Sequence, residues 1–174
     1  MEFSVFRTCL IMVLLFTTSV LNANIFQSKD WSWGSDNERF LYAATVNADN
    51  QSFGQYCYLD SKVCVYLLNT GIVCREGSEL TALINSDKGS KEATLLCRMN
   101  SSGDSVYMLV PFNLIDVVAR QASYFAIAIP TNQADFQVAH FSLAGSTYAI
   151  ELMLTATEKI IDIQEQGKPA EILL

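Results

Sequence analysis

Cysteine is the residue type whose number and spacing in this sequence say most about chemistry. Beyond its first two dozen residues, the 174-residue chain holds an even set of four, Cys57, Cys64, Cys74 and Cys97. Six, nine and 22 residues separate them in turn, so no pair has the C-x-x-C spacing that is typical of zinc and thiol-redox sites. This spacing favours two structural disulfides over a zinc site, and paired cysteines are not available as thiolate nucleophiles.

One of the three possible pairings is favoured by local strand geometry. Residues 53–59 and 62–68 are rich in aromatic and β-branched side chains, and residues 60–61 between them fit a two-residue hairpin turn. In that register Cys57 falls directly opposite Cys64. Opposed residues at a hydrogen-bonded position lie ~5.5 Å apart at Cα, which is within the range of a disulfide. The hairpin therefore predicts a Cys57–Cys64 bond and leaves the other two cysteines as partners in a longer loop.

Histidine chemistry is limited to one residue, because His140 is the only imidazole in the chain. It could act as a general base for Ser142 or Ser146, but a strand histidine without a catalytic role is the favoured interpretation. The sequence has no G-x-S-x-G nucleophile elbow, no Gly-rich phosphate loop and no H-E-x-x-H motif. We therefore expect no catalytic residue, no cofactor and no metal ion.

Five aromatic residues are candidates for a partner-binding surface. Tyr56, Tyr58 and Tyr66 occupy alternate positions around the predicted hairpin, where they could stack on one face, although packing within the sheet is the favoured interpretation. Trp31 and Trp33 share one side of an extended segment. They could clamp a partner or fill the interior of the fold, and the sequence does not decide between these two roles.

Composition and charge exclude several classes of protein. The chain is 51% hydrophobic and only 17% charged, which is too apolar for an intrinsically disordered protein. Eleven Lys and Arg against 18 Asp and Glu give a formal net charge of −7, and there is no dense basic stretch. This balance argues against nucleic acid and anionic lipid as partners.

The N-terminal residues have the pattern of a secretory signal peptide. Arg7 precedes an apolar run over residues 9–16, and smaller or more polar residues follow up to Ala23. The run is about half of the ~20 apolar residues that a spanning helix needs, so cleavage after Ala23 is favoured over a membrane anchor. Cleavage removes Glu2, Arg7 and Cys9, so the net charge stays at −7 and the cysteine count becomes even. We expect a mature chain without a membrane span that is periplasmic or secreted.

Short strands dominate the remaining pattern. Apolar runs between turn-forming clusters predict strands at residues 40–46, 53–59, 62–68, 79–84, 93–97, 106–110, 124–129 and 136–143. Helical spacing of apolar residues predicts two late helices, one over 112–121 and one capped by Ser146. The expected fold is mainly β with two short late helices (α+β), an antiparallel β-sandwich or small barrel stapled by two disulfides. We expect one domain over 24–163, followed by a flexible tail over 164–174.

Several segments together resemble a known family. They are Val-Cys-Arg-Glu-Gly-Ser-Glu-Leu at 73–80, Leu-Ile-Asn-Ser at 83–86, the pair Cys97-Arg98, and Phe-Ser-Leu-Ala-Gly-Ser-Thr-Tyr-Ala-Ile at 141–150. This combination resembles the invasion-associated locus B family of small exported bacterial proteins, over roughly residues 40–155. The resemblance implies a periplasmic or secreted bacterial β-domain, linked in some members to host-cell invasion. It implies neither a substrate nor an active site.

Two classes of function are therefore compared. The favoured one is a non-enzymatic protein of the bacterial envelope that acts by binding another protein or by interacting with a host. The alternative is a small periplasmic hydrolase or a thiol-redox factor. The redox alternative needs a reducible cysteine pair of low pKa, whereas the spacing of the four cysteines predicts structural disulfides.

Overall fold

The computed structural model describes residues 25–36, 39–100, 102–131 and 135–167. The predicted signal peptide, residues 1–23, lies outside the described residues. Most of the predicted tail, residues 168–174, lies outside them as well.

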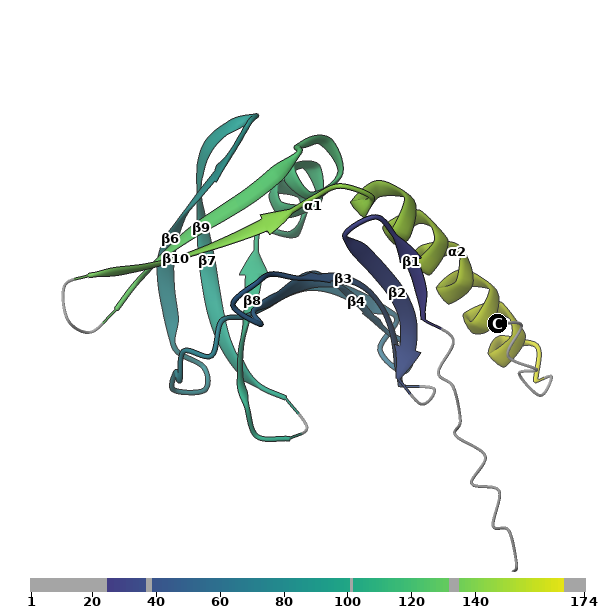
Figure 1. Ribbon diagram of the computed structural model, residues 1–174. Coiled ribbons are helices and arrows are strands. Elements are labelled where there is room, and N and C mark those ends of the chain that lie inside the picture. Colours follow the sequence, from purple (N-terminus) through teal and green to yellow (C-terminus); the bar gives the residue numbers. More distant parts are fainter. Residues whose placement is uncertain (1–24, 37–38, 101, 132–134, 168–174) are drawn as a thin grey trace, which may run out of the picture.

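The described residues form one antiparallel sheet of ten strands together with two helices (Figure 1). The strands are β1 (Phe26–Ser28), β2 (Trp31–Asp36), β3 (Phe40–Val46), β4 (Ser52–Tyr58), β5 (Val63–Asn69), β6 (Glu79–Ser86), β7 (Gly89–Met99), β8 (Ser105–Val110), β9 (Tyr124–Pro130) and β10 (Phe136–Ser142). The helices are α1 (Phe112–Gln121) and α2 (Ser146–Glu165). The strand order in the sheet is β1-β2-β3-β4-β5-β8-β7-β6-β9-β10. The predicted class, mainly β with two late helices and two disulfides, is confirmed.

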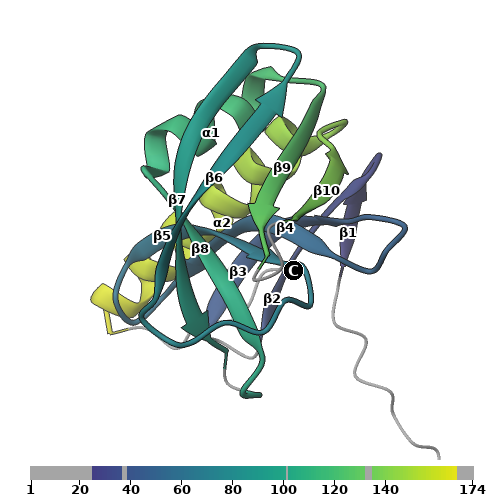
Figure 2. The same cartoon turned by 90° about the vertical axis from the view of Figure 1, so that its left-hand side faces the viewer.

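The sheet curls so that the end of β10 approaches the turn between β1 and β2 (Figures 1 and 2). The backbone N–H of Asp30 donates to the carbonyl of Ala144 at 3.2 Å, and the indole N–H of Trp31 donates to the carbonyl of Ser142 at 2.9 Å. The Asn47 amide donates to the backbone oxygen of His140 at 3.1 Å. These bonds occupy acceptors along β10, the last strand of the sheet, and so protect an edge that would otherwise be free to pair. The antiparallel β-architecture that the strand pattern predicted is thus built from one continuous, curled sheet.

The core lies on the inner face of this curled sheet. Phe53 on β4 is fully buried, and its ring centroid lies 4.4 Å from that of Phe125, 5.7 Å from those of Tyr66 and Phe141, and 6.0 Å from that of Trp31. These four partners belong to β9, β5, β10 and β2. Aromatic rings at such separations gain about 0.5–1.5 kcal/mol per pair beyond the burial of their area. Phe53 therefore joins both halves of the sheet in one cluster.

Both helices pack onto the same core. Ile115, Val118 and Ala119 of α1 and Ala149, Ile150 and Met153 of α2 belong to the buried cluster. The last residue of α2, Glu165, pairs with Lys62 in the turn between β4 and β5. Helix α2 therefore lies against the first half of the sheet along its whole length.

The structure corrects the prediction for α2 in two respects. The helix is 20 residues long rather than short, and it includes the first two residues of the predicted tail. Its N-cap is Gly145 rather than Ser146. Gly145 has φ +91°, and a Cβ there would lie 2.0 Å from the carbonyl oxygen of Ser28, so only glycine fits. The Ser146 hydroxyl instead lies 2.6 Å from the carbonyl oxygen of Ala119 and 2.7 Å from that of Leu143, which joins α2 to α1.

The predicted cystine hairpin is confirmed in pairing and register, but its turn comprises four residues, 59–62, rather than the predicted two, 60–61. Cys57 is bonded to Cys64 and faces it across β4 and β5, and Cys74 is bonded to Cys97. The Cα atoms of the hairpin pair are 4.0 Å apart rather than the predicted ~5.5 Å. This short separation is typical of the closely spaced, non-hydrogen-bonded position of an antiparallel ladder, so the assignment to a hydrogen-bonded position is wrong.

Two further boundaries differ from the sequence prediction. The β6–β7 strands extend to a Ser86–Gly89 pair, so their turn is tighter than the predicted 85–90 segment, with Gly89 at φ +105°. The polar N-terminal segment, to which no strand was assigned, contains β1 and β2. Burial of Trp31 and Trp33 on alternate positions of β2 compensates for the polar Ser32 between them.

The two disulfides are expected to differ in their effect on stability. They close loops with sequence separations of 7 and 23. Loop entropy then predicts that replacing Cys57 and Cys64 with Ser lowers the free energy of unfolding by about 2 kcal/mol, and replacing Cys74 and Cys97 lowers it by about 3 kcal/mol. Urea denaturation of the two double variants measures both losses. A larger loss for the hairpin pair would contradict this ranking.

Candidate functional site

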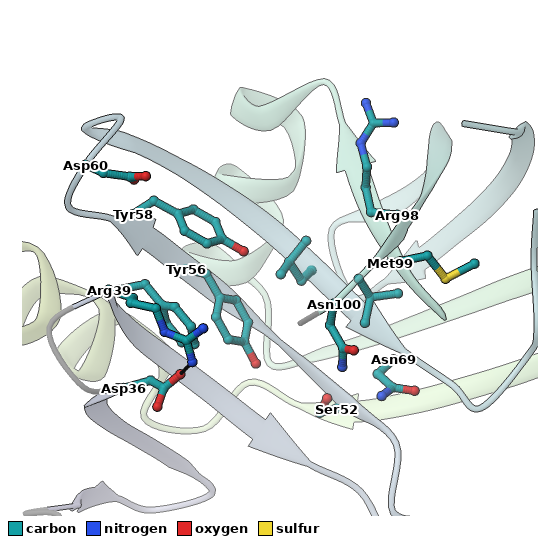
Figure 3. Close-up of a pocket in the computed structure, with 13 residues that line it drawn as sticks. Asp36, Arg39, Ser52, Tyr56, Tyr58, Asp60, Asn69, Arg98, Met99 and Asn100 are labelled. Atoms are coloured by element: carbon teal, nitrogen blue, oxygen red, sulfur yellow. Dashed lines mark hydrogen bonds and ion pairs between the residues drawn. The ribbon is translucent and has the colours of Figure 1, made fainter. Parts of the chain in front are cut away.

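A cleft of about 630 Å³ opens on the outer face of the sheet, and we call it the tyrosine cleft (Figure 3). Its floor consists of outward-facing side chains of four neighbouring strands: Phe40 on β3, Tyr56 and Tyr58 on β4, Leu67 on β5 and Val106 on β8. The rim is polar. One side of the rim carries Asp36, Arg39 and Asp60, and the other carries Ser52, Asn69, Arg98, Met99 and Asn100.

Strand alternation places the aromatic rings in this cleft. Because Cys57 points into the core, its neighbours Tyr56 and Tyr58 point outward. In the β3–β4 register Phe40 faces Tyr58 and Tyr42 faces Tyr56. The four rings form one cluster, which we call the aromatic cluster, with centroid distances of 5.5 Å for Phe40–Tyr58, 5.7 Å for Phe40–Tyr56, 5.9 Å for Tyr42–Tyr56 and 6.4 Å for Phe40–Tyr42. Tyr42 lies beside the cleft, and the other three rings line it.

Two glycines, Gly34 and Gly54, allow neighbouring strands and side chains to approach closely on this part of the sheet. Gly54, opposite Ala44, sits where an added Cβ would lie 2.4 Å from the carbonyl oxygen of Ala43 and 2.5 Å from the Ala44 Cβ. Gly34 on β2 has the hydroxyl oxygen of Tyr42 3.1 Å from the position of a Cβ. Glycine within a strand marks close approach of backbones or a sharp bend. Strands β2, β3 and β4 are therefore tightly packed beside the aromatic cluster.

The environment keeps the tyrosine hydroxyls protonated. Burial, and then the neighbouring Tyr42 and Tyr58, together raise the pKa of Tyr56 to about 12. The pKa of Tyr42 is raised by burial and by Asp36, and that of Tyr58 by burial and by Asp60. A neutral tyrosine hydroxyl can donate a hydrogen bond and also accept one. The floor of the cleft thus combines aromatic faces with hydrogen-bond donors.

The charges on the rim are arranged unevenly. The Arg39 guanidinium donates to the Asp36 carboxylate at 2.8 Å, and this exposed pair contributes at most about 1 kcal/mol. The Asp60 carboxylate accepts the backbone N–H of Ser61 at 2.6 Å and forms no ion pair with the described residues. Arg98 on the opposite wall likewise makes no ion pair within the described part of the chain. A carboxylate and a guanidinium are thus available on opposite sides of the cleft.

The far wall is held by a local network. The Asn100 side-chain oxygen accepts the backbone N–H groups of Ser102 and Asp104, at 2.9 and 2.8 Å. Its amide group donates to the Asp104 carboxylate at 3.1 Å. Such side-chain bonds to a nearby backbone are typical of ordered turns. These bonds therefore orient the Asn100 side chain on this part of the rim.

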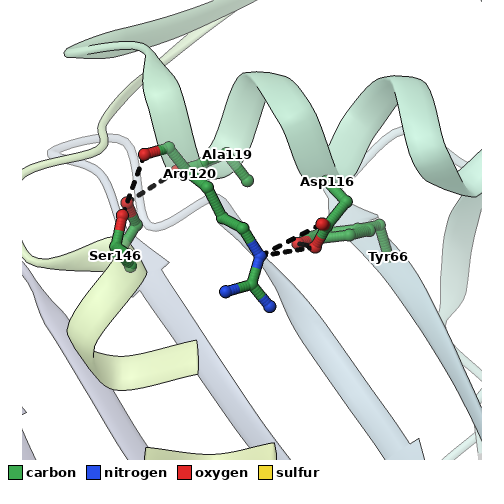
Figure 4. A network of polar contacts seen from close by, with 6 residues as sticks. Tyr66, Asp116, Ala119, Arg120 and Ser146 are labelled. Atoms are coloured by element: carbon green, nitrogen blue, oxygen red, sulfur yellow. Dashed lines mark hydrogen bonds and ion pairs between the residues drawn. The ribbon is translucent and has the colours of Figure 1, made fainter. Parts of the chain in front are cut away.

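Tyr66 does not share a face with Tyr56 and Tyr58, so the three tyrosines do not stack together, and for Tyr66 the favoured interpretation of packing within the sheet is supported. It faces Gln55 across β4 and β5 and is fully buried in the core. Its hydroxyl donates to the Asp116 carboxylate at 2.8 Å, and the Arg120 Nε donates to the same carboxylate at 3.0 and 3.1 Å (Figure 4). Burial, and then Asp116, raises the pKa of Tyr66. This network attaches α1 to the sheet.

The two tryptophans also lie in the core. Trp31 is fully buried and Trp33 is 9% exposed, with its ring stacked on Phe26 at 4.9 Å. Of the two roles left open by the sequence, filling the interior is therefore the one that the structure supports. Neither indole presents a face with which to clamp a partner.

The possible serine–histidine pair is not assembled. His140 is exposed on β10, and no hydrogen bond links its imidazole to Ser142 or Ser146. Ser146 is buried between two helices and Ser142 accepts the backbone N–H of Ala144 at 3.2 Å. Within the described ranges no group of three or more His, Cys, Asp or Glu side chains is placed to hold a metal ion. Nor does any described helix have the length and apolarity needed to cross a membrane.

Sequence reasoning found two residues of the cleft, Tyr56 and Tyr58, and missed the others. Phe40 in the cleft and Tyr42 beside it carried a signal, because they alternate with the buried Leu41 and Ala43 on a predicted strand. The rim residues carried none, since their proximity depends on pairing between segments far apart in sequence. The predicted hairpin register could also have separated Tyr66 from the other two tyrosines.

The fold and cleft define a disulfide-stabilised, mainly β domain with an aromatic cleft on the outer face of its sheet. The fold is similar to that of the crystal structure of invasion associated protein B from Bartonella henselae, with a TM-score of 0.53 and 14% sequence identity. The likeness covers 77% of this chain and 98% of that chain. It confirms, for the fold, the resemblance that the sequence segments suggested. No protein-family model and no curated protein matches the chain.

The raised pKa of Tyr56 predicts a loss of stability in alkali. The unfolded chain releases this proton near pH 10, whereas the folded protein retains it to about pH 12. Stability is therefore retained below pH 10 and lost as the pH rises toward 12. Urea denaturation at pH 8 to 11 should show a shallower loss for Tyr56→Phe than for the unsubstituted protein. Tyr148→Phe, at an exposed tyrosine of α2, is the matched control, and equal slopes for all three proteins would contradict the assignment.

Proposed function

We propose that this protein is an exported, non-enzymatic binding protein of the bacterial cell envelope that recognises another protein through the tyrosine cleft. The observation that carries the proposal is the aromatic cluster of Phe40, Tyr42, Tyr56 and Tyr58, next to a cleft whose rim carries Arg98 and Asn100. Tyrosine and arginine are enriched among the residues that dominate protein interfaces. Tyrosine supplies a large and rigid contact area at low conformational entropy, and Ser and Asn supply adaptable hydrogen bonds.

Two observations support export, and a third supports a role at the interface with a host. The four described cysteines form two disulfides, which persist in oxidising compartments such as the periplasm or the extracellular space. The N-terminal pattern ending at Ala23 predicts a cleaved signal peptide. The similar structure from Bartonella henselae is of a protein named for invasion, and this name supports a role at the interface with a host.

The chemistry of the described residues favours binding over catalysis. The alternative hydrolase needs a nucleophile beside a base, and the serines nearest to His140 in sequence are occupied by backbone groups instead. The alternative thiol-redox factor needs a reducible cysteine pair, whereas Cys57 and Cys97 are each no more than 1% exposed. A role in partner recognition requires only the cleft as it stands.

Capture of a partner by matched variants tests this function. The mature chain, residues 24–174, is immobilised and exposed to envelope extract, alongside Tyr56→Ala, Tyr58→Ala and the control Tyr148→Ala. We expect the first two variants to retain at least about tenfold less partner, because each removes an aromatic contact worth about 1.4 kcal/mol or more. Circular dichroism establishes that each variant is folded. Equal retention by all variants would contradict a role for the cleft.

A further inference from the structure

The position of the tyrosine cleft restricts the way in which it can hold a peptide. Its floor lies over β3, β4, β5 and β8. β3 and β4 are paired on both sides, and β5 is paired with β4 along its length and with β8 at residues 66–68. The backbone N–H and C=O groups of these paired segments are used in the sheet, so a partner that lies over the floor cannot be held there as another strand. Recognition must come from side chains, that is, from aromatic faces and from the donors on the rim.

The polyproline II conformation meets these requirements. A segment in this conformation has no internal hydrogen bonds, so its carbonyl groups need donors from outside. The protonated hydroxyls of Tyr56 and Tyr58, the Asn69 and Asn100 amides and the Arg98 guanidinium supply donors around the aromatic floor. Flat pyrrolidine rings pack well on aromatic rings, and proline pre-orders the segment so that little entropy is lost on binding.

The carboxylate of Asp60 beside the floor of the cleft favours a particular charge on the residue that flanks the prolines of a bound segment. Asp60 lies close enough to Tyr58 to raise its pKa, and within the described residues it has no cationic partner. Asp36 on the same side is already paired with Arg39. A basic residue next to the prolines would complete the Asp60 site, whereas an acidic residue would be repelled there.

We propose that the tyrosine cleft binds an extended, proline-rich segment of a partner protein, with a Lys or Arg of that segment beside Asp60. This inference rests on the proposed function, because it assigns the chemistry of the partner at the same site. Stacking on Phe40, Tyr56 and Tyr58 provides the affinity, and Asp60 provides the preference for a basic neighbour. Arg98 and Asn100 on the far wall donate to backbone carbonyl groups of the segment.

Synthetic peptides test the inference directly by isothermal titration calorimetry with the mature protein. The probes are capped decaproline with one Arg at either end, the same peptides with Glu in place of Arg, and a Gly-Ser peptide of equal length. We expect the better Arg peptide to bind with Kd below about 1 mM and at least about fivefold more tightly than its Glu counterpart. That ratio should shrink between about 50 mM and about 500 mM salt, because ions screen the exposed Asp60.

Variants separate the two parts of the proposed site. Tyr56→Ala should abolish binding of every proline peptide, while Tyr148→Ala should leave binding unchanged. Tyr56→Phe, which keeps the ring and loses the donor, should weaken binding by about threefold to tenfold. Asp60→Asn should remove the preference for Arg over Glu and retain binding to decaproline.

Several outcomes would overturn the inference. They are absence of proline-peptide binding, binding that is insensitive to Tyr56→Ala, or Tyr56-dependent binding of chitotetraose in place of the peptides, which would identify a carbohydrate site. If the capture of an envelope partner depends on Tyr56 while no proline peptide binds, the proposed function stands and this inference fails. If proline peptides bind as expected while capture is insensitive to Tyr56, the proposed function fails instead.

Discussion

The rest of the structure depends on the packing of two adjacent residues of β4, Phe53 on the inner face of the sheet and Gly54 on the outer face. Phe53 points inward and meets aromatic rings from β2, β5, β9 and β10, so it holds the two halves of the sheet around one core. Gly54 points outward, where β3 lies too close for any Cβ. On the inner face of β4, Phe53 is thereby surrounded by four aromatic rings. On the outer face, Gly54 allows β4 to pack close against β3.

The tyrosine cleft depends on the same alternation. A slip of one residue in the β4–β5 register would carry the outward tyrosines to the core and the core residues to solvent. The Cys57–Cys64 disulfide prevents such a slip within the very strand segment that carries Tyr56 and Tyr58. The cystine is thus both a stabilising element and the device that keeps the aromatic floor of the cleft on the outside. The proposed binding surface and the stability of the fold therefore depend on the same hairpin.

Local patterns predicted much of this fold and little of the site. The helix over 112–121, the hairpin register and the disulfide pairing depend on residues close in sequence, and all are confirmed. Strand β2 was missed, because its polar residues are tolerated only when its tryptophans are buried against distant elements. The cleft was missed for a similar reason, since it joins residues near 36–60 with residues near 98–106 through the pairing of β5 with β8. No local pattern specifies that pairing.

The central claim is that recognition takes place on the outer face of β3 and β4. The seven tyrosines of the chain report on it directly, because they are spread over the cleft, the core and distant surfaces. A ring-labelled NMR spectrum of the mature protein, recorded with and without its purified envelope partner, should show shifts for Tyr56 and Tyr58. The buried Tyr66 and the exposed Tyr124 and Tyr148 should not move. Shifts confined to Tyr124 or Tyr148, with Tyr56 and Tyr58 unchanged, would contradict the account.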